Sequence, residues 1–146
     1  MLVNLEAVAM PPDERGWCEV RHFAYTSDAD DHANNGGGVR DANNALEIVQ
    51  QLIGKAEERE FSSWYEGKPP QGEDVVPLWE VTIRVFRSHR HVSCYQVEYR
   101  RHNGCPAQAT DAMMRTYRAV KQALKNGRKA LEAEREQKRK KRGANS

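Results

Sequence analysis

Two segments indicate the centre of the fold, Trp79-Glu80-Val81-Thr82-Ile83-Arg84-Val85-Phe86 and Tyr95-Gln96-Val97-Glu98-Tyr99-Arg100. In both segments apolar and polar residues alternate, which is the pattern of a strand with one buried face. The polar stretch 87–91 separates the two segments. We therefore predict a β-hairpin whose apolar residues face the core and whose outer face and tip are rich in arginine.

Three other segments show regular spacing of apolar residues. Alternation over 17–25 predicts a strand, and apolar residues at helical spacing predict a helix over 41–66. A similar stripe predicts a final helix that begins near Thr110 and that Asn126-Gly127 breaks or frays. Residues 60–66 also fit a strand, so their state stays open.

This order of elements predicts the fold class and the domain limits. We expect an α+β protein, a small β-α-β-β-α sandwich in which helices cover one face of a three-stranded, mostly antiparallel sheet. The 146 residues suit one domain, which we place at 17–127. Residues 1–16 contain a proline-led breaker and are expected to be an irregular lead-in, and 128–146 are expected to be a basic extension, helical or disordered.

Composition argues against a membrane or secreted protein. Mean hydropathy is −0.88, and no apolar run approaches the roughly 20 residues that a membrane span needs. The first residues lack the features of a secretory signal. Three cysteines form a sparse and odd set, which suits a reducing compartment, and we expect a cytoplasmic protein.

The net charge of +2 conceals two halves of opposite sign. Residues 1–76 carry 15 acidic and 6 basic residues, whereas 77–146 carry 6 acidic and 17 basic residues, so the halves have net charges of −9 and +11. A concentrated basic half is typical of proteins that bind phosphates or acidic partners. The alternative interpretation of the basic half, without a binding function, is a solvated helix followed by a loose charged tail.

The basic half supplies the candidate nucleic-acid-binding residues. Arginine binds phosphate through paired hydrogen bonds and stacks on bases, and an exposed Phe86 would offer a further stacking surface. The same phenyl ring could instead pack beneath a helix or at a dimer interface. The candidates on the hairpin, the final helix and the tail are Arg84, Phe86, Arg87, Arg90, Arg100, Arg101, Arg115, Arg118, Lys121, Lys125, Lys138, Arg139, Lys140, Lys141 and Arg142.

No metal site or cofactor is predicted. His91-x-x-Cys94 and His102-x-x-Cys105 have the residue types of a zinc site, but a strand over 94–102 would separate the pairs by about 26 Å. A carboxylate cluster near Asp28 (Asp28, Asp30, Asp31 and His32) would suit a Mg²⁺-dependent nuclease, but it sits in a loop rich in glycine and asparagine.

Catalytic motifs are also lacking. The chain has no G-x-S-x-G motif, and the glycine run 36–38 lacks the lysine that ends a phosphate-binding loop. We therefore expect a protein that is not an enzyme and that binds nucleic acid with little sequence preference, single-stranded or duplex. The alternative is a small interaction or inhibitor module, such as an adaptor or a phage-type modulator of a host enzyme, whose acidic half contacts a protein partner. A nuclease is a third interpretation.

Overall fold

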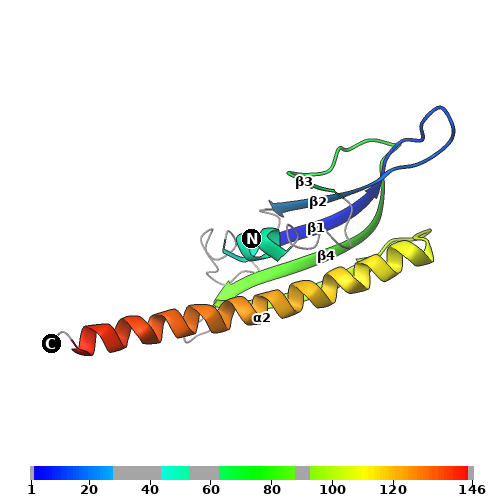
Figure 1. Ribbon diagram of the computed structural model, residues 1–146. Coiled ribbons are helices and arrows are strands. Elements are labelled where there is room, and N and C mark those ends of the chain that lie inside the picture. The colour runs from blue at the N-terminus through cyan, green and yellow to red at the C-terminus, as the bar shows by residue number, and fades with distance from the viewer. Residues whose placement is uncertain (1, 28–43, 53–62, 88–92, 145–146) are drawn as a thin grey trace.

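The computed structural model describes residues 2–27, 44–52, 63–87 and 93–144. The protein is α+β, as predicted, and a five-stranded mixed sheet in the order β3-β2-β1-β4-β5 forms its centre (Figure 1). The predicted three-stranded sheet is wrong, because no strand was predicted at 2–9 and residues 60–66 were left open between helix and strand. The elements are β1 (Leu2–Ala9), β2 (Val20–Ser27), β3 (Trp64–Glu66), β4 (Val76–Arg87), β5 (Ser93–Arg101) and α2 (Ala107–Ala144).

The missed strand, β1, lies in the middle of the sheet. It pairs antiparallel with β2 on one side and with β4 on the other, so the predicted irregular lead-in over 1–16 is wrong for residues 2–9. Val3 and Leu5 are buried on one face, and Val8 is buried on the other. Alternation of apolar and polar residues is the signal by which a single sequence indicates a strand. A strand that is buried on both faces does not show this alternation clearly.

The predicted hairpin is confirmed as β4 and β5. Val81 pairs with Tyr99 and Ile83 with Val97, and the register runs from Trp79 to Arg87 without a shift. The side chains of Trp79, Val81 and Ile83 are fully buried. They pack with residues of β1 and of the helices, so the hairpin supplies one side of the core.

The predicted helix over 41–66 is correct only in part. Residues 44–52 are helical, and Ala45 and Val49 are buried in the core. Residues 64–66 form strand β3, which pairs parallel to β2, so the helix does not reach 66. Trp64 lies beside His22 of β2, with ring centroids 5.0 Å apart. This contact is distant in sequence, and local spacing of apolar residues gives no information about it.

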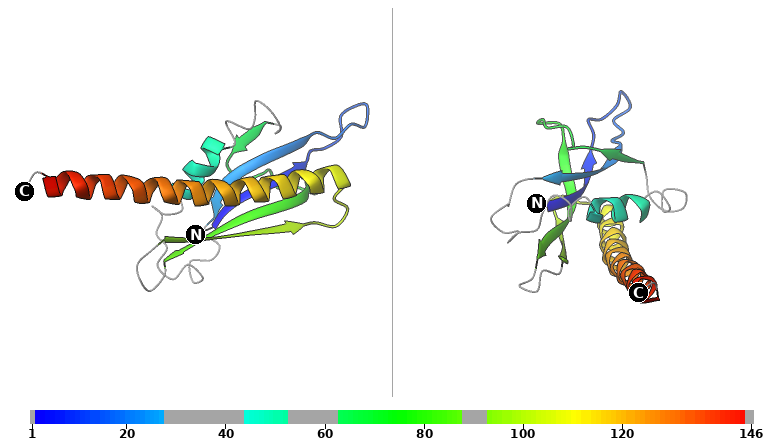
Figure 2. Two further views of the ribbon diagram at one scale, coloured as in Figure 1. Left: turned by 60° about the horizontal axis from the view of Figure 1, so that its bottom comes forward. Right: turned by 90° about the vertical axis from the view of Figure 1, so that its left-hand side faces the viewer.

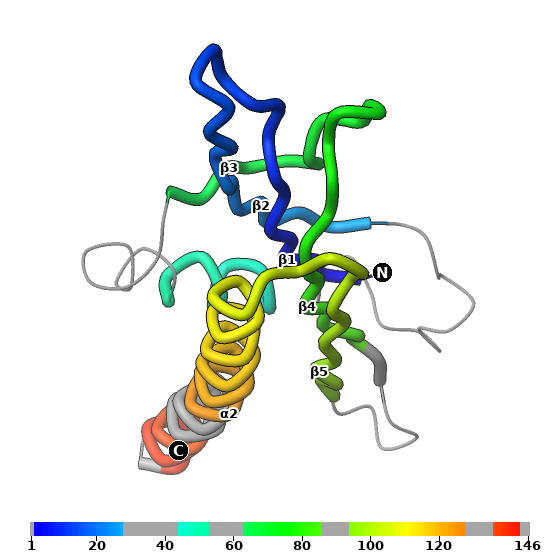
Figure 3. Tube along the Cα trace, turned by 90° about the vertical axis from the view of Figure 1, so that its right-hand side faces the viewer, coloured from blue at the N-terminus to red at the C-terminus, as the bar shows by residue number. Residues whose placement is uncertain are grey.

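The final helix, α2, is longer and more regular than predicted. It begins at Ala107, passes through Gly127 without a break and continues to Ala144. A Cβ added at Gly127 would lie 2.8 Å from Cδ1 of Ile48, so glycine allows helix 44–52 to pack closely on α2. The helix crosses one face of the sheet under β4 and β5, and its C-terminal part extends beyond the strands (Figures 1 and 2). Figure 3 shows the same layering along the helix axis.

The predicted strand over 17–25 begins later, at Val20. Residues 10–19 form an extended turn between β1 and β2 that projects from the sheet (Figure 1). Asp13 holds this turn, since its Oδ1 accepts hydrogen bonds from the backbone nitrogens of Arg15 and Trp17, each at 2.9 Å. Trp17 therefore sits in an ordered turn rather than in a strand.

Candidate nucleic-acid interface

The basic residues of α2 are exposed: Arg115, Arg118, Lys121 and Lys125 lie on the side of the helix that faces away from the sheet, and the consecutive residues 138–142 surround its C-terminal part. Met113, Val120 and Leu124 are buried in the core, and this fixes the orientation of the helix. Among the side chains that the structure describes in α2, nine are basic and two are acidic, Asp111 and Glu136, and all eleven are exposed. The basic surface of α2 comprises Arg115, Arg118, Lys121, Lys125, Lys138, Arg139, Lys140, Lys141 and Arg142.

The spacing of these residues places several of them on one side of the helix. Arg118, Lys125 and Arg139 follow one another at intervals of 7 and 14 residues. A straight helix drifts by about 20° per seven residues, so residues at such intervals stay close to one line. At 1.5 Å per residue, the line from Arg118 to Arg139 is roughly 32 Å long. The basic surface is therefore extended rather than a compact patch.

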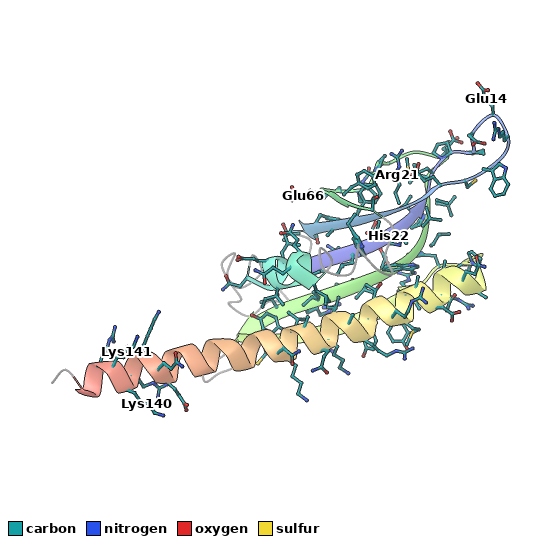
Figure 4. All side chains as sticks on the ribbon, viewed as in Figure 1. Glu14, Arg21, His22, Glu66, Lys140 and Lys141 are labelled. Atoms are coloured by element: carbon teal, nitrogen blue, oxygen red, sulfur yellow. The ribbon has the colours of Figure 1, made fainter. Side chains whose placement is uncertain are left out.

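The C-terminal part of this surface stands clear of the sheet. The described side chains of 136–143 are all exposed, and Figure 4 shows Lys140 and Lys141 on the part of α2 that extends past the strands. The sequence left this segment as a helix or a disordered tail, and in the structure it is helical. Its charges are consequently held at regular positions along the helix axis.

One lysine of the basic surface is held by aromatic contacts. The ammonium of Lys121 donates to the Tyr117 hydroxyl at 3.3 Å and lies 5.4 Å from the centre of the same ring. Tyr117 in turn makes an edge contact with Tyr99 of β5, with centroids 4.8 Å apart. These contacts limit the freedom of Lys121 before any ligand binds, which lowers the entropic cost of binding.

The arginines of the hairpin do not join the basic surface of α2. Residues alternate between the two faces of a sheet, and Trp79 and Val81 face the helices, so Arg84 and Arg100 project from the opposite face. Arg101 pairs with Trp79 in register and is exposed on the side that α2 covers. Arg84 and Arg100 therefore do not share one binding face with the basic surface of α2.

The two arginines on the far face also have acidic neighbours. The Nε of Arg84 lies 3.5 Å from the Glu98 carboxylate, and Arg100 is directly opposite Glu80. These carboxylates reduce the positive potential that a phosphate would meet there. The side chains of Phe86 and Arg87 and the whole of Arg90 lie outside the part that the structure describes.

The same face of the sheet holds a cluster that the sequence analysis missed. Glu6 of β1 is directly opposite Glu80 of β4, and the Tyr25 hydroxyl of β2 donates a hydrogen bond to Glu6. His102 lies beyond β5, with its Nε2 3.1 Å from the other carboxylate, Glu80. Glu6 was not among the candidate residues, because its segment was predicted to be irregular. A predicted strand over 2–9 would have placed Glu6 in the sheet.

Burial sets the protonation of this cluster. Glu6 is 9% exposed, and burial raises the pKa of its carboxyl group. The hydrogen bond from Tyr25 lowers that pKa, whereas the neighbouring Glu80 raises it. Burial and the contact with Glu6 also raise the pKa of Tyr25. Burial and the neighbouring Glu80 therefore favour the protonated form of the Glu6 carboxyl group, and a buried acidic cluster of this kind does not suit a phosphate.

A pocket of about 300 Å³ opens beside this cluster. The segment from Lys68 to Pro77 forms one wall of the pocket, and Glu6, Val8 and Tyr25 line the sheet side. A second pocket of about 360 Å³ lies by the β1–β2 turn, next to Trp17. Neither pocket includes a residue of the basic surface of α2.

The residues considered for metal binding are dispersed. Cys94 is near the start of β5 and His102 follows its end, so the two lie at opposite ends of one strand. The Sγ of Cys105 lies 3.6 Å from the Thr110 hydroxyl. Within the described ranges, no group of three or more His, Cys, Asp or Glu side chains is placed to hold a metal ion. Asp28, its neighbouring acids and His91 lie outside those ranges.

Comparisons with protein families, curated proteins and solved structures found no match to this chain. In the part of the chain that the structure describes, no helix is long and apolar enough to cross a membrane.

Proposed function

We propose that this protein binds nucleic acid through the basic surface of α2, by contacts with the phosphate backbone. The observation that carries the proposal is the continuity of α2. Residues from Arg115 to Arg142 share one helix, and its described side chains include nine exposed basic ones. The same nine residues on a broken helix and a loose tail would present no common surface.

The geometry favours phosphate contacts over recognition of bases. The basic side chains that the structure describes on α2 are exposed lysines and arginines, which suit phosphate oxygens, and the amides of the exposed Gln122 and Asn126 are hydrogen-bonded to each other at 3.0 Å. Each neutralised phosphate releases condensed counterions, so affinity is expected to fall steeply as salt rises. Binding is accordingly expected to tolerate many sequences. Duplex and single strand are both candidate ligands.

The test is a charge reversal on the helix with a matched control. Arg118 and Lys125 are exposed and one heptad apart, and replacing both with Glu changes the net charge by four units. Arg15→Glu with Lys68→Glu makes the same change at exposed positions outside α2. Affinity for a short mixed-sequence duplex and for the matching single strand is measured by fluorescence anisotropy across a series of salt concentrations.

The helix variant is expected to bind about tenfold or more weakly at moderate salt, with the salt slope reduced by about 2, because it neutralises two fewer phosphates. The control variant is expected to keep the slope of the original protein. Equally weakened binding by the two variants would show that net charge alone, and not the surface of α2, drives binding. No binding by the original protein at low salt would overturn the proposal.

A second candidate is a protein-interaction module, and Trp17 is the observation that favours it. Its side chain is 75% exposed, although the hydrogen bonds of Asp13 hold the surrounding turn in place. Tryptophans are enriched among the residues that dominate the binding energy of protein interfaces. If Arg118 and Lys125 have no effect on nucleic-acid binding, this turn, with its acidic neighbours Asp13 and Glu14, becomes the leading candidate surface.

A further inference from the structure

The outer edge of β5 is a long strand edge with little protection. The sheet has two edges, β3 with three residues and β5 with nine. β5 contains neither proline nor glycine, and its pairing with β4 has no bulge. Proteins usually shorten, bend or cover such edges, because the unpaired backbone groups attract another strand. Within the described residues, no backbone pairs with the outer side of β5.

The register shows which backbone groups point outward. His102 donates its backbone N–H to the carbonyl of Leu78 at 2.9 Å, so this pair is hydrogen-bonded across the hairpin. In an antiparallel pair, hydrogen-bonded and non-hydrogen-bonded positions alternate. The N–H and C=O groups of Val97, Tyr99 and Arg101 therefore point away from β4, toward the outer edge.

The side chains along this edge are complementary to themselves. If two copies of the strand run antiparallel about Tyr99, Glu98 of each copy lies opposite Arg100 of the other. Both residues are exposed and lie on the face opposite α2. Directly opposed charges of unlike sign stabilise a strand pair, and like charges destabilise it. Tyr99, 50% exposed on the other face, would meet its own copy at the twofold axis.

We propose that β5 pairs with β5 of a second copy of this chain, antiparallel and centred on Tyr99. The backbone groups of Val97, Tyr99 and Arg101 then form the hydrogen bonds between the copies. An antiparallel pair of strands related by a twofold axis keeps the same face of both sheets on the same side, because the axis is perpendicular to the sheet. The dimer therefore has one continuous sheet with both α2 helices on one face.

The contact is small, and this sets the strength of the association. The short ladder from Val97 to Arg101 buries an area well below the roughly 1,200–2,000 Å² of a standard stable interface. We therefore expect a weak dimer that depends on protein concentration. Sedimentation velocity of the full chain, without nucleic acid, should show the weight-average sedimentation coefficient rising over about a hundredfold range of concentration.

Charge variants test the register. Glu98→Lys and Arg100→Glu each place like charges opposite each other in a homodimer, so each variant alone is expected to sediment as a monomer. In a mixture of the two chains, each chain again faces the opposite charge on its partner, and a heterodimer is expected to form. Circular dichroism and thermal melting confirm that each variant is folded, since Glu98 also contacts Arg84 within the chain.

A backbone variant provides a second, independent test. Tyr99→Pro removes an outward N–H that makes no bond to β4, so it is expected to abolish dimerisation while the chain stays folded. A monomeric original protein at every concentration would overturn the proposal, and so would a mixture that shows no heterodimer. A Tyr99→Pro variant that is folded and still dimeric would contradict the proposed edge contact.

This dimer is independent of the proposed nucleic-acid binding, because its assay contains no nucleic acid. Reversal of Arg118 and Lys125 tests binding and leaves the β5 edge unchanged. The charge variants Glu98→Lys and Arg100→Glu test dimerisation and change only the face of the sheet opposite α2. Failure of one proposal is therefore distinguishable from failure of the other.

Discussion

The carboxyl group of Glu6 lies in the middle of the sheet, where an acid is unusual. It is directly opposite a second carboxyl group, Glu80, and accepts a hydrogen bond from Tyr25. Burial is the main reason that its pKa is raised. A proton on Glu6 removes its repulsion with the neighbouring Glu80, and the folded protein therefore binds this proton more tightly than the unfolded chain does.

The sign of the resulting pH dependence follows from this shift. A group with a raised pKa in the folded state contributes stability that is fully present below its unfolded pKa, near 4.5, and that is lost as pH rises through the folded pKa. Burial lowers the pKa of His22 to about 4, which gives the opposite dependence between about pH 4 and 6.5. Comparing a Glu6 variant with the original protein at each pH separates the contribution of Glu6 from that of His22, because His22 is present in both proteins.

We predict that Glu6→Gln stabilises the protein at neutral pH. A glutamine amide can accept from Tyr25 and donate to Glu80 without carrying charge, so the expected gain in the free energy of unfolding is about 1 kcal/mol, the size of one net hydrogen bond. At pH 4 the gain is expected to be smaller. Urea unfolding at pH 4 and pH 7 measures both values. Glu98→Gln, an exposed carboxyl on the same face, serves as the control and should show no gain that grows with pH.

At the scale of elements, α2 shows how tertiary packing overrides a local signal. Asn126-Gly127 is a poor helical pair, and glycine costs roughly 1 kcal/mol relative to alanine inside a helix. The helix nevertheless continues, because its apolar stripe packs on the sheet and Ile48 of helix 44–52 fills the space at Gly127. The absence of a side chain at this position permits the close packing of the two helices.

We predict that Gly127→Leu destabilises the protein, by about 1–3 kcal/mol, the usual cost of overfilling a packed contact. A new side chain must displace Ile48, whose Cδ1 and Cγ1 would lie 2.8 and 3.3 Å from the added Cβ. Gly143→Leu is the matched control on the same helix, since a Cβ there meets nothing within 4 Å. Thermal melting measures both variants. Equal melting temperatures for the two would contradict the close contact between the helices.

At the scale of the whole molecule, much of the described basic charge lies apart from the apolar core. The sheet and helix 44–52 hold most of the apolar residues, whereas α2 carries nine exposed basic side chains and continues beyond the strands (Figure 1). Five of these nine basic side chains lie in the projecting part of α2, from Glu136 onward. Stability therefore depends on the buried side chains of α2, and the proposed binding depends on its exposed basic side chains.

We predict that removing residues 136–146 leaves the fold intact and weakens nucleic-acid binding. The described side chains from 136 to 143 are exposed, so their removal exposes little apolar area to water. The salt slope of binding should fall by about 0.9 for each phosphate that the shortened chain no longer neutralises. Melting temperature and anisotropy titrations measure the two effects. A large drop in melting temperature would show that this segment stabilises the core.

The sequence alone was sufficient for the features that depend on short-range patterns. Alternation over 79–86 and 95–100 predicted the hairpin, and the α+β class was correct. The separation of charge between the halves indicated where the basic residues are. Each of these features follows from residues that are neighbours in the chain or a few positions apart, which is the range over which periodicity carries information.

The tertiary structure decided the features that depend on distant contacts. Burial on both faces makes residues 2–9 the central strand, and Trp64 becomes part of a strand because β2 provides its partner. Packing against the sheet and Ile48 carries α2 through Gly127. The two faces of the sheet separate Arg84 from the basic surface of α2, although both lie in the basic half of the sequence. Neighbours across a sheet or between helices are distant in the chain, and short-range periodicity does not reveal which residues they are.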